Sequence, residues 1–176
     1  MNDEQGAPIH RLFDLGDLSQ AGSRIEIVAG GDDLARLARW VGVEAVNAFG
    51  ARVELGRLSR TSFSFEAELE ADIVQSCVVT LEPVATRITK HIARDLHFSP
   101  RPRAEGGVLT LSSDEADVPE EIASLDYDLA APLLEEFLLA IDPYPRKEGV
   151  AFQPPAQPAE PPESPFAVLK RLNEPG

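Results

Sequence analysis

The clearest pattern along the chain is the alternation of apolar and polar residues in TSFSFEAELEADIV, residues 61–74. A period of two residues is that of a β-strand. A strand with one apolar face and one charged face is typical of an antiparallel sheet that has water on one side. The apolar parity holds Phe63, Phe65, Ala67, Leu69 and Ala71, and the polar parity holds Ser64, Glu66, Glu68, Glu70 and Asp72.

The same period extends over residues 43–98 and predicts further strands on both sides of this one. Residues 46–59 form one strand, with Gly50 as a bulge or kink. We expect CVVTL (77–81) to be a strand before a turn at Glu82-Pro83, and VATRITKHIARDLHF (84–98) to be the next strand. The segments 9–18 and 23–29 add two shorter strands.

The segment 84–98 breaks its own pattern at two positions. Lys90 and Arg94 fall on the parity that otherwise holds Val84, Ile88, Ile92, Leu96 and Phe98. Either a bulge shifts the register there, or this face reaches the border of the sheet, where long side chains extend into water.

Two segments predict helices. Residues 30–43 carry a stripe of Leu34, Leu37, Ala38 and Val41, with Asp32 as the cap and Gly42 as the end. Residues 126–142 predict a helix capped by Asp128 that is apolar around most of its circumference. A helix of this kind is usually buried, so we expect it under the sheet.

These elements predict an α+β fold, with a twisted antiparallel sheet, open or barrel-like, packed against two main helices. The domain spans residues 1–150 and includes a mobile acidic excursion near 99–122. A Pro-rich linker, residues 151–163, leads to a short amphipathic helix at 164–173. Its stripe of Phe166, Leu169 and Leu172 either docks back on the domain or binds a partner.

The charge of the chain limits its partners. The 176 residues carry a net charge of −14, and the sequence pI is about 4.5. An acidic surface repels DNA and anionic membranes, no apolar run is long enough to cross a bilayer, and the N-terminal residues lack a signal-peptide pattern. A single cysteine forms no internal disulfide, so we expect a cytoplasmic location.

One stretch is cationic. Residues 84–103 hold five basic residues against one acid. These cations are candidate RNA contacts, because a guanidinium group binds phosphate with two hydrogen bonds. The alternative is that they face the carboxylates of residues 66–72 on the neighbouring strand. The five candidates are Arg87, Lys90, Arg94, Arg101 and Arg103.

The sequence contains no catalytic motif, no metal-ligand motif and no cofactor-binding loop, which favours a non-enzymatic protein. His91 and His97 lie about 20 Å apart along a strand, too far to share a metal ion. Cys77, in a predicted apolar strand, is interpreted as a small hydrophobic residue.

Four segments follow one another along the chain: DDLARLARWVG, CVVTLEPV, YDLAAPLLEEFLLAIDPYP and SPFAVLKRL. In the order and spacing of these segments, over nearly its whole length, the chain resembles the YceD family, also called the large ribosomal RNA subunit accumulation proteins. The most specific pieces are Asp128-Leu129 with Glu136 in the second helix, and PFAVL at 165–169. Many relatives carry C-x-x-C where this chain has Cys77-Val-Val-Thr80, so a zinc or redox role is not carried over to this protein.

The resemblance implies a role in the accumulation or processing of large-subunit ribosomal RNA. Two hypotheses follow. The acidic surface binds a basic ribosomal protein or assembly factor, with Phe166, Leu169 and Leu172 as an anchor, or the stretch 87–103 binds the RNA directly. The net charge favours the protein partner.

Overall fold

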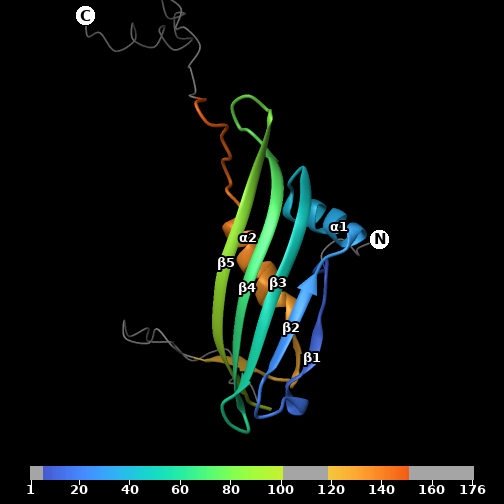
Figure 1. Ribbon diagram of the computed structural model, residues 1–176, viewed down its shortest axis with the longest axis vertical. Helices are drawn as coiled ribbons and strands as arrows, with labels where there is room; N and C mark the ends of the chain where they lie inside the picture. Colours follow the sequence, from blue (N-terminus) through green and yellow to red (C-terminus); the bar gives the residue numbers. More distant parts are fainter. Residues whose placement is uncertain (1–5, 101–118, 151–176) are drawn as a thin grey trace, which may run out of the picture.

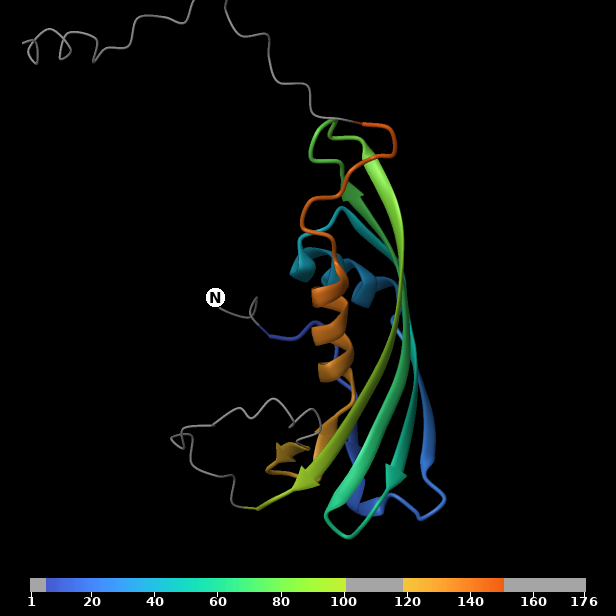
Figure 2. The same ribbon diagram turned by 90° about the vertical axis from the view of Figure 1, so that its left-hand side faces the viewer.

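The structure, a computed structural model, describes residues 6–100 and 119–150. A long, twisted sheet forms one layer, and both helices lie on its concave side (Figures 1 and 2). The predicted α+β fold with a mainly antiparallel sheet is therefore confirmed. The sheet is open, so the barrel-like form is not adopted.

The main sheet has the strand order β2-β3-β4-β5-β6. Neighbouring strands are antiparallel except for β5 and β6, which are parallel. The pairing of β6 covers only Leu96–Phe98 of β5, so the rest of β5 borders no further strand among the described residues. The strands are β2 (Ser23–Val28), β3 (Ala45–Arg57), β4 (Ser62–Ser76), β5 (Pro83–Phe98) and β6 (Glu120–Ile122).

A small second sheet holds the two ends of the described domain together. It pairs β1 (Leu12–Asp14) with β7 (Asp126–Asp128), and a short 3-10 helix, η1 (Leu15–Asp17), follows β1. The strand predicted in residues 9–18 is therefore confirmed, but it is only three residues long.

The two helices are α1 (Gly31–Val41) and α2 (Ala130–Ala140). Gly42 ends α1 in the left-handed conformation, with φ of 74°, as predicted. The prediction that Asp32 caps α1 is wrong, because Gly30 occupies the capping position and Asp32 lies inside the first turn. At α2 the Asp128 carboxylate, one residue before the capping position, accepts the N–H of Ala130 at 3.0 Å.

The core lies between the concave face of the sheet and the helices. The alternation predicted for residues 61–74 is confirmed, since Phe63, Phe65 and Leu69 of β4 are fully buried. Phe49 of β3 meets Phe137 of α2 edge to face, with ring centroids 5.2 Å apart. The expectation that α2 is buried under the sheet is confirmed for the side that holds Leu133 and Phe137, while the side with Leu138 and Leu139 remains open to solvent.

The structure resolves the irregular pattern in residues 84–98. β4 and β5 pair without a register shift from Ser62 to Ser76, so no bulge is present in this pair. Lys90 and Arg94 point to the concave side at the border of the sheet, which was the second explanation. The bulge that does occur lies in β3 between Val46 and Ala48, and the bulge or kink predicted at Gly50 is therefore wrong.

The prediction of a strand at residues 77–81 is also wrong. β4 ends at Ser76, and Cys77–Thr80 form the turn that leads into β5. Leu81 follows with a φ of 61°, the only positive φ of a non-glycine residue among those described. The predicted linker at 151–163, the terminal helix at 164–173 and most of the acidic excursion lie outside the described residues.

Candidate interaction surface

Among residues 6–100 and 119–150, no helix lies on the convex side of the main sheet (Figure 2). We call the side chains that point to this side the outer face. They include eight carboxylates and three arginines, so five carboxylates are in excess. The carboxylates are Glu26, Glu54, Glu66, Glu68, Glu70, Asp72, Asp95 and Glu121, and the arginines are Arg24, Arg52 and Arg87.

Each arginine of the outer face binds a carboxylate on the neighbouring strand. The closest N···O distances are 2.7 Å for Arg24 with Glu54, 2.8 Å for Arg52 with Glu68, and 2.8 Å for Arg87 with Glu70. The hydrogen bond from each guanidinium raises the pKa of Arg52 and of Arg87. These side chains are 63–75% exposed, so the pairs contribute little to stability.

Some carboxylates of the outer face have no cationic partner. Glu26, Glu66 and Asp95 form no ion pair with any described residue. Glu66 also lies directly opposite Glu54 on β3, an arrangement of like charges that destabilises a sheet. The outer face therefore keeps unneutralised negative charge in its centre.

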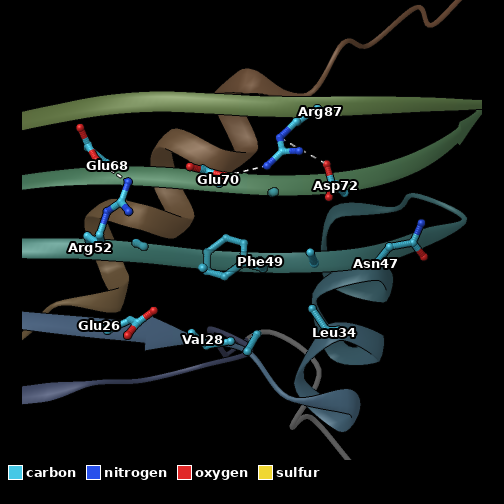
Figure 3. Close-up of a pocket in the computed structure, with 15 residues that line it drawn as sticks. Glu26, Val28, Leu34, Asn47, Phe49, Arg52, Glu68, Glu70, Asp72 and Arg87 are labelled. Atoms are coloured by element: carbon cyan, nitrogen blue, oxygen red, sulfur yellow. Dashed lines mark hydrogen bonds and ion pairs between the residues drawn. The ribbon is translucent and has the colours of Figure 1, made fainter.

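Two hollows mark this face. The larger, about 430 Å³, lies where β2 and β3 approach α1, and its lining combines Val28 and Leu34 with the charged residues around Arg52 and Glu70 (Figure 3). The second, about 350 Å³, is lined by Glu66, His91 and their neighbours. Arg52 and Glu68 line both hollows, so their ion pair separates them.

The predicted RNA-binding cations do not gather on one side. Arg87 belongs to the outer face and binds Glu70 and, at 3.8 Å, Asp72. Arg87 therefore makes the cross-strand pairing with carboxylates of residues 66–72 that is the alternative to RNA contact. Arg94 and Lys90 point to the opposite side, while Arg101 and Arg103 lie outside the described residues.

Arg94 joins three parts of the fold. Its guanidinium lies 3.3 Å from Glu120 of β6, 2.6 Å from Glu135 of α2 and 4.0 Å from Glu136. Partial burial opposes the charged form, but the hydrogen bond and charge of Glu135 outweigh it and raise the pKa of Arg94. Lys90, by contrast, is exposed and forms no ion pair with the described residues.

Cys77 is fully buried in the turn after β4. Hydrogen bonds from the Thr80 side chain and from the backbone N–H groups of Lys147, Thr80 and Val79 lower its pKa to about 6, against the effect of burial. The Lys147 N–H lies 3.4 Å from the sulfur. Among residues 6–100 and 119–150, no three His, Cys, Asp or Glu side chains are grouped so as to hold a metal ion.

The sequence alone identified only part of this surface. The carboxylates of β4 were recognised from their alternation, but Glu26 and Glu54 join them through strand pairing. The sequence predicts a strand at 23–29, but it does not show the register of this strand against β3, which places Glu26 on the outer face. The predicted partner-binding residues Phe166, Leu169 and Leu172 lie outside the described residues.

Comparison of the chain with models of protein families, with curated proteins and with solved structures finds no match. Within the described part of the chain, no helix has the length and apolar character needed to span a bilayer.

Proposed function

We propose that this protein is a non-enzymatic cytoplasmic factor that supports the accumulation or processing of large-subunit ribosomal RNA. It acts by binding a basic ribosomal protein or assembly factor, and the outer face is the surface that binds it. The proposal combines the sequence resemblance to the YceD family with the charge of the uncovered sheet face.

The observation that carries the proposal is the excess of carboxylates on a sheet face that no described element covers. Three arginines are already paired within that face, whereas Glu26 and Glu66 are not paired with any described residue. A surface of this kind attracts a lysine- or arginine-rich protein and repels phosphate groups. Val28, which is 70% exposed beside the larger hollow, offers apolar contact within the same face.

The test is affinity capture from cell lysate with and without ribonuclease, using three forms of the full chain. The first is the natural sequence, and the second is the double variant Glu26→Lys, Glu66→Lys. The third, Asp17→Lys, Glu148→Lys, makes the same change in charge at exposed positions away from the outer face. We expect the natural chain and the third form to retain a basic ribosomal protein after ribonuclease treatment, and the second form to lose it.

A ribosomal protein that disappears on ribonuclease treatment favours contact through RNA. Equal capture by the second and third forms contradicts the outer face as the binding surface. Absence of any ribosome-related partner, together with normal ribosomal RNA levels in a deletion strain, contradicts the proposed function as a whole.

Direct RNA binding is the second candidate, and the exposed Lys90 favours it. In that case RNA affinity falls with added salt, and substitution of Lys90, Arg101 and Arg103 by alanine lowers it further. Arg87 and Arg94 are weaker candidates, since carboxylates already bind both of them.

A further inference from the structure

Exposed apolar side chains are concentrated near the end of the described chain. Eight large hydrophobic residues of the described chain are highly exposed, and five of them lie in the turn after β4 or between the end of α2 and Tyr144. The other three are scattered over β1, β2 and the turn after β3. The five are Val78, Leu81, Leu138, Leu139 and Tyr144.

The open side of α2 is the centre of this distribution. Leu138 is 49% exposed and Leu139 is 73% exposed, whereas Leu133 and Phe137 on the opposite side of the helix are fully buried. Figure 2 shows α2 between the sheet and the open side of the molecule. Leu138 and Leu139 leave an apolar surface that no other described element covers, and the exposed Tyr144 follows five residues later in the chain. We call residues 138–144 the α2 shoulder.

The described chain ends beside the turn after β4. The Val150 N–H donates to the Lys147 carbonyl at 3.2 Å, and the Lys147 N–H donates to the sulfur of Cys77. The Val78 N–H of this turn also donates to the Pro145 carbonyl at 2.9 Å. The last 26 residues of the chain therefore start beside the turn after β4, eleven residues along the chain from Leu139.

The length of the intervening chain is sufficient for a return to the shoulder. Residues 151–163 are rich in proline, and an extended polyproline segment of this size spans about 40 Å at ~3.1 Å per residue. Leu139 and Val150 are eleven residues apart, so they lie at most about 40 Å from each other. Residues 164–172 are thus able to reach Leu139.

The terminal segment also has the complementary chemistry. Its sequence SPFAVLKRL places Phe166, Leu169 and Leu172 in one stripe, with Lys170 and Arg171 beside it. Of the acids near the shoulder, Glu135 and Glu136 already lie against Arg94, whereas Asp142 forms no ion pair with a described residue. Apolar side chains thus meet apolar side chains, and Asp142 is the carboxylate left for Lys170 or Arg171.

We propose that residues 164–172 of the same chain bind the α2 shoulder, with Phe166, Leu169 and Leu172 against Leu138 and Leu139. A tethered segment has an effective concentration in the millimolar range, which a partner in solution rarely reaches. The segment therefore covers the shoulder in the free protein. This contact leaves the outer face, on the other side of the sheet, open.

The test is amide hydrogen exchange of the purified full-length protein, followed by mass spectrometry of peptides from 138–144 and 164–172. We compare the natural chain with Leu169→Glu, with Leu139→Glu and with the control Leu58→Glu. Leu58 is 62% exposed in the turn after β3, so the control adds the same charge to an exposed leucine elsewhere.

We expect exchange in 164–172 to be roughly tenfold faster in Leu139→Glu than in the natural chain, and unchanged in Leu58→Glu. Leu169→Glu, which lies outside the described domain, accelerates exchange in 138–144. Equal urea midpoints of Leu139→Glu and Leu58→Glu show that the effect is not general unfolding.

Three results overturn the proposal. Exchange in 164–172 at the rate of an unstructured peptide in the natural chain means that nothing covers the shoulder in the free protein. Protection that grows with protein concentration means that a second copy supplies the segment. Protection of 164–172 that Leu139→Glu leaves intact means that the segment binds elsewhere on the domain. Each result is independent of whether the outer face binds a basic protein.

Discussion

The two faces of the main sheet are built by the same strands and differ in almost every physical property. The concave face of β4 presents Phe63, Phe65 and Leu69 to α2 and its neighbours, and these side chains are fully buried. The convex face of the same strand presents Glu66 and Glu68 to solvent. Since successive side chains of a strand point to opposite sides, a shift of one residue exchanges the two faces.

This difference separates stability from recognition. Burial of apolar side chains on the concave side supplies most of the folding free energy, whereas exposed ion pairs on the outer face contribute at most about 1 kcal/mol each. The outer face is therefore free to change its charge without loss of the fold. The predictions below test this separation, beginning with the largest effect.

Two neighbouring residues of β4 give the sharpest comparison. Phe65 is fully buried and meets Tyr127 edge to face, with ring centroids 6.2 Å apart. We expect Phe65→Ala to lower the free energy of unfolding by about 3–5 kcal/mol, because it removes buried surface and leaves a cavity. Urea denaturation measures the change.

The control is Glu66→Ala, one residue further along the strand, which we expect to change stability by less than about 0.5 kcal/mol. A loss of similar size in both variants breaks the distinction between the faces.

Two arginines of β5 repeat the comparison with charged side chains. The side chain of Arg94 is 24% exposed and contacts Glu120 and Glu135, while that of Arg87 is 66% exposed. We expect Arg94→Ala to cost about 1–3 kcal/mol, since it removes the hydrogen bonds of a partly buried guanidinium that joins β6 to α2. Arg87→Ala costs about 0–1 kcal/mol. Equal values from denaturation experiments would show that burial does not govern these pairs.

The pH dependence of stability tests the thiol at the end of the concave face. The pKa of Cys77 is lowered from 9.0 to about 6 in the folded protein, so the unfolded chain binds more protons between these values. The contribution to stability is complete above pH 9 and is lost as the pH falls through 6. We expect the free energy of unfolding of the natural chain to decrease as the pH falls from 9 to 6.

Cys77→Ala removes this part of the pH dependence, although the variant is less stable at every pH because three N–H groups lose their acceptor. An identical slope in both proteins from pH 9 to 6 rules out a thiolate in the folded state.

The smallest effect concerns like charges on the outer face. Glu54 and Glu66 are cross-strand neighbours, so Glu66→Gln removes a repulsion without changing the shape of the side chain. We expect a gain of about 0.2–0.5 kcal/mol at low ionic strength, measured by thermal or urea unfolding. The gain should vanish at high salt, because exposed charges are then screened. A gain that persists in salt has another cause.

The sequence predicted the parts of the fold that depend on local pattern. The alternation in residues 61–74 predicts a half-buried strand, and Gly42 predicts the end of a helix. Each signal lies within a single element, and both predictions are confirmed. The turn at Cys77 was missed because CVVTL is apolar and β-branched, which favours a strand locally. Its backbone instead bonds to Pro145, a contact 67 residues away that no local pattern indicates.

The candidate surface was only partly predictable for the same reason. The position of Arg87 opposite Asp72 requires the β4–β5 register, and the partners of Arg94 come from β6 and α2. These pairings arise from tertiary packing. The exposure of Leu139 was missed because an apolar helix normally has neighbours on all sides.

Lys90, which interrupts the apolar parity of β5, lies on an edge of the sheet that has no neighbouring strand among the described residues. From Pro83 to Asp95 this strand has no neighbour on one side among the described residues, and its register is regular throughout. A long, regular strand at the edge of a sheet favours edge-to-edge pairing with a sheet of another molecule. Lys90 is exposed at the middle of this border, and two copies brought together there in antiparallel fashion would place like charges near each other. Lys90, the cation of this row that no described carboxylate binds, thus helps to keep each molecule separate.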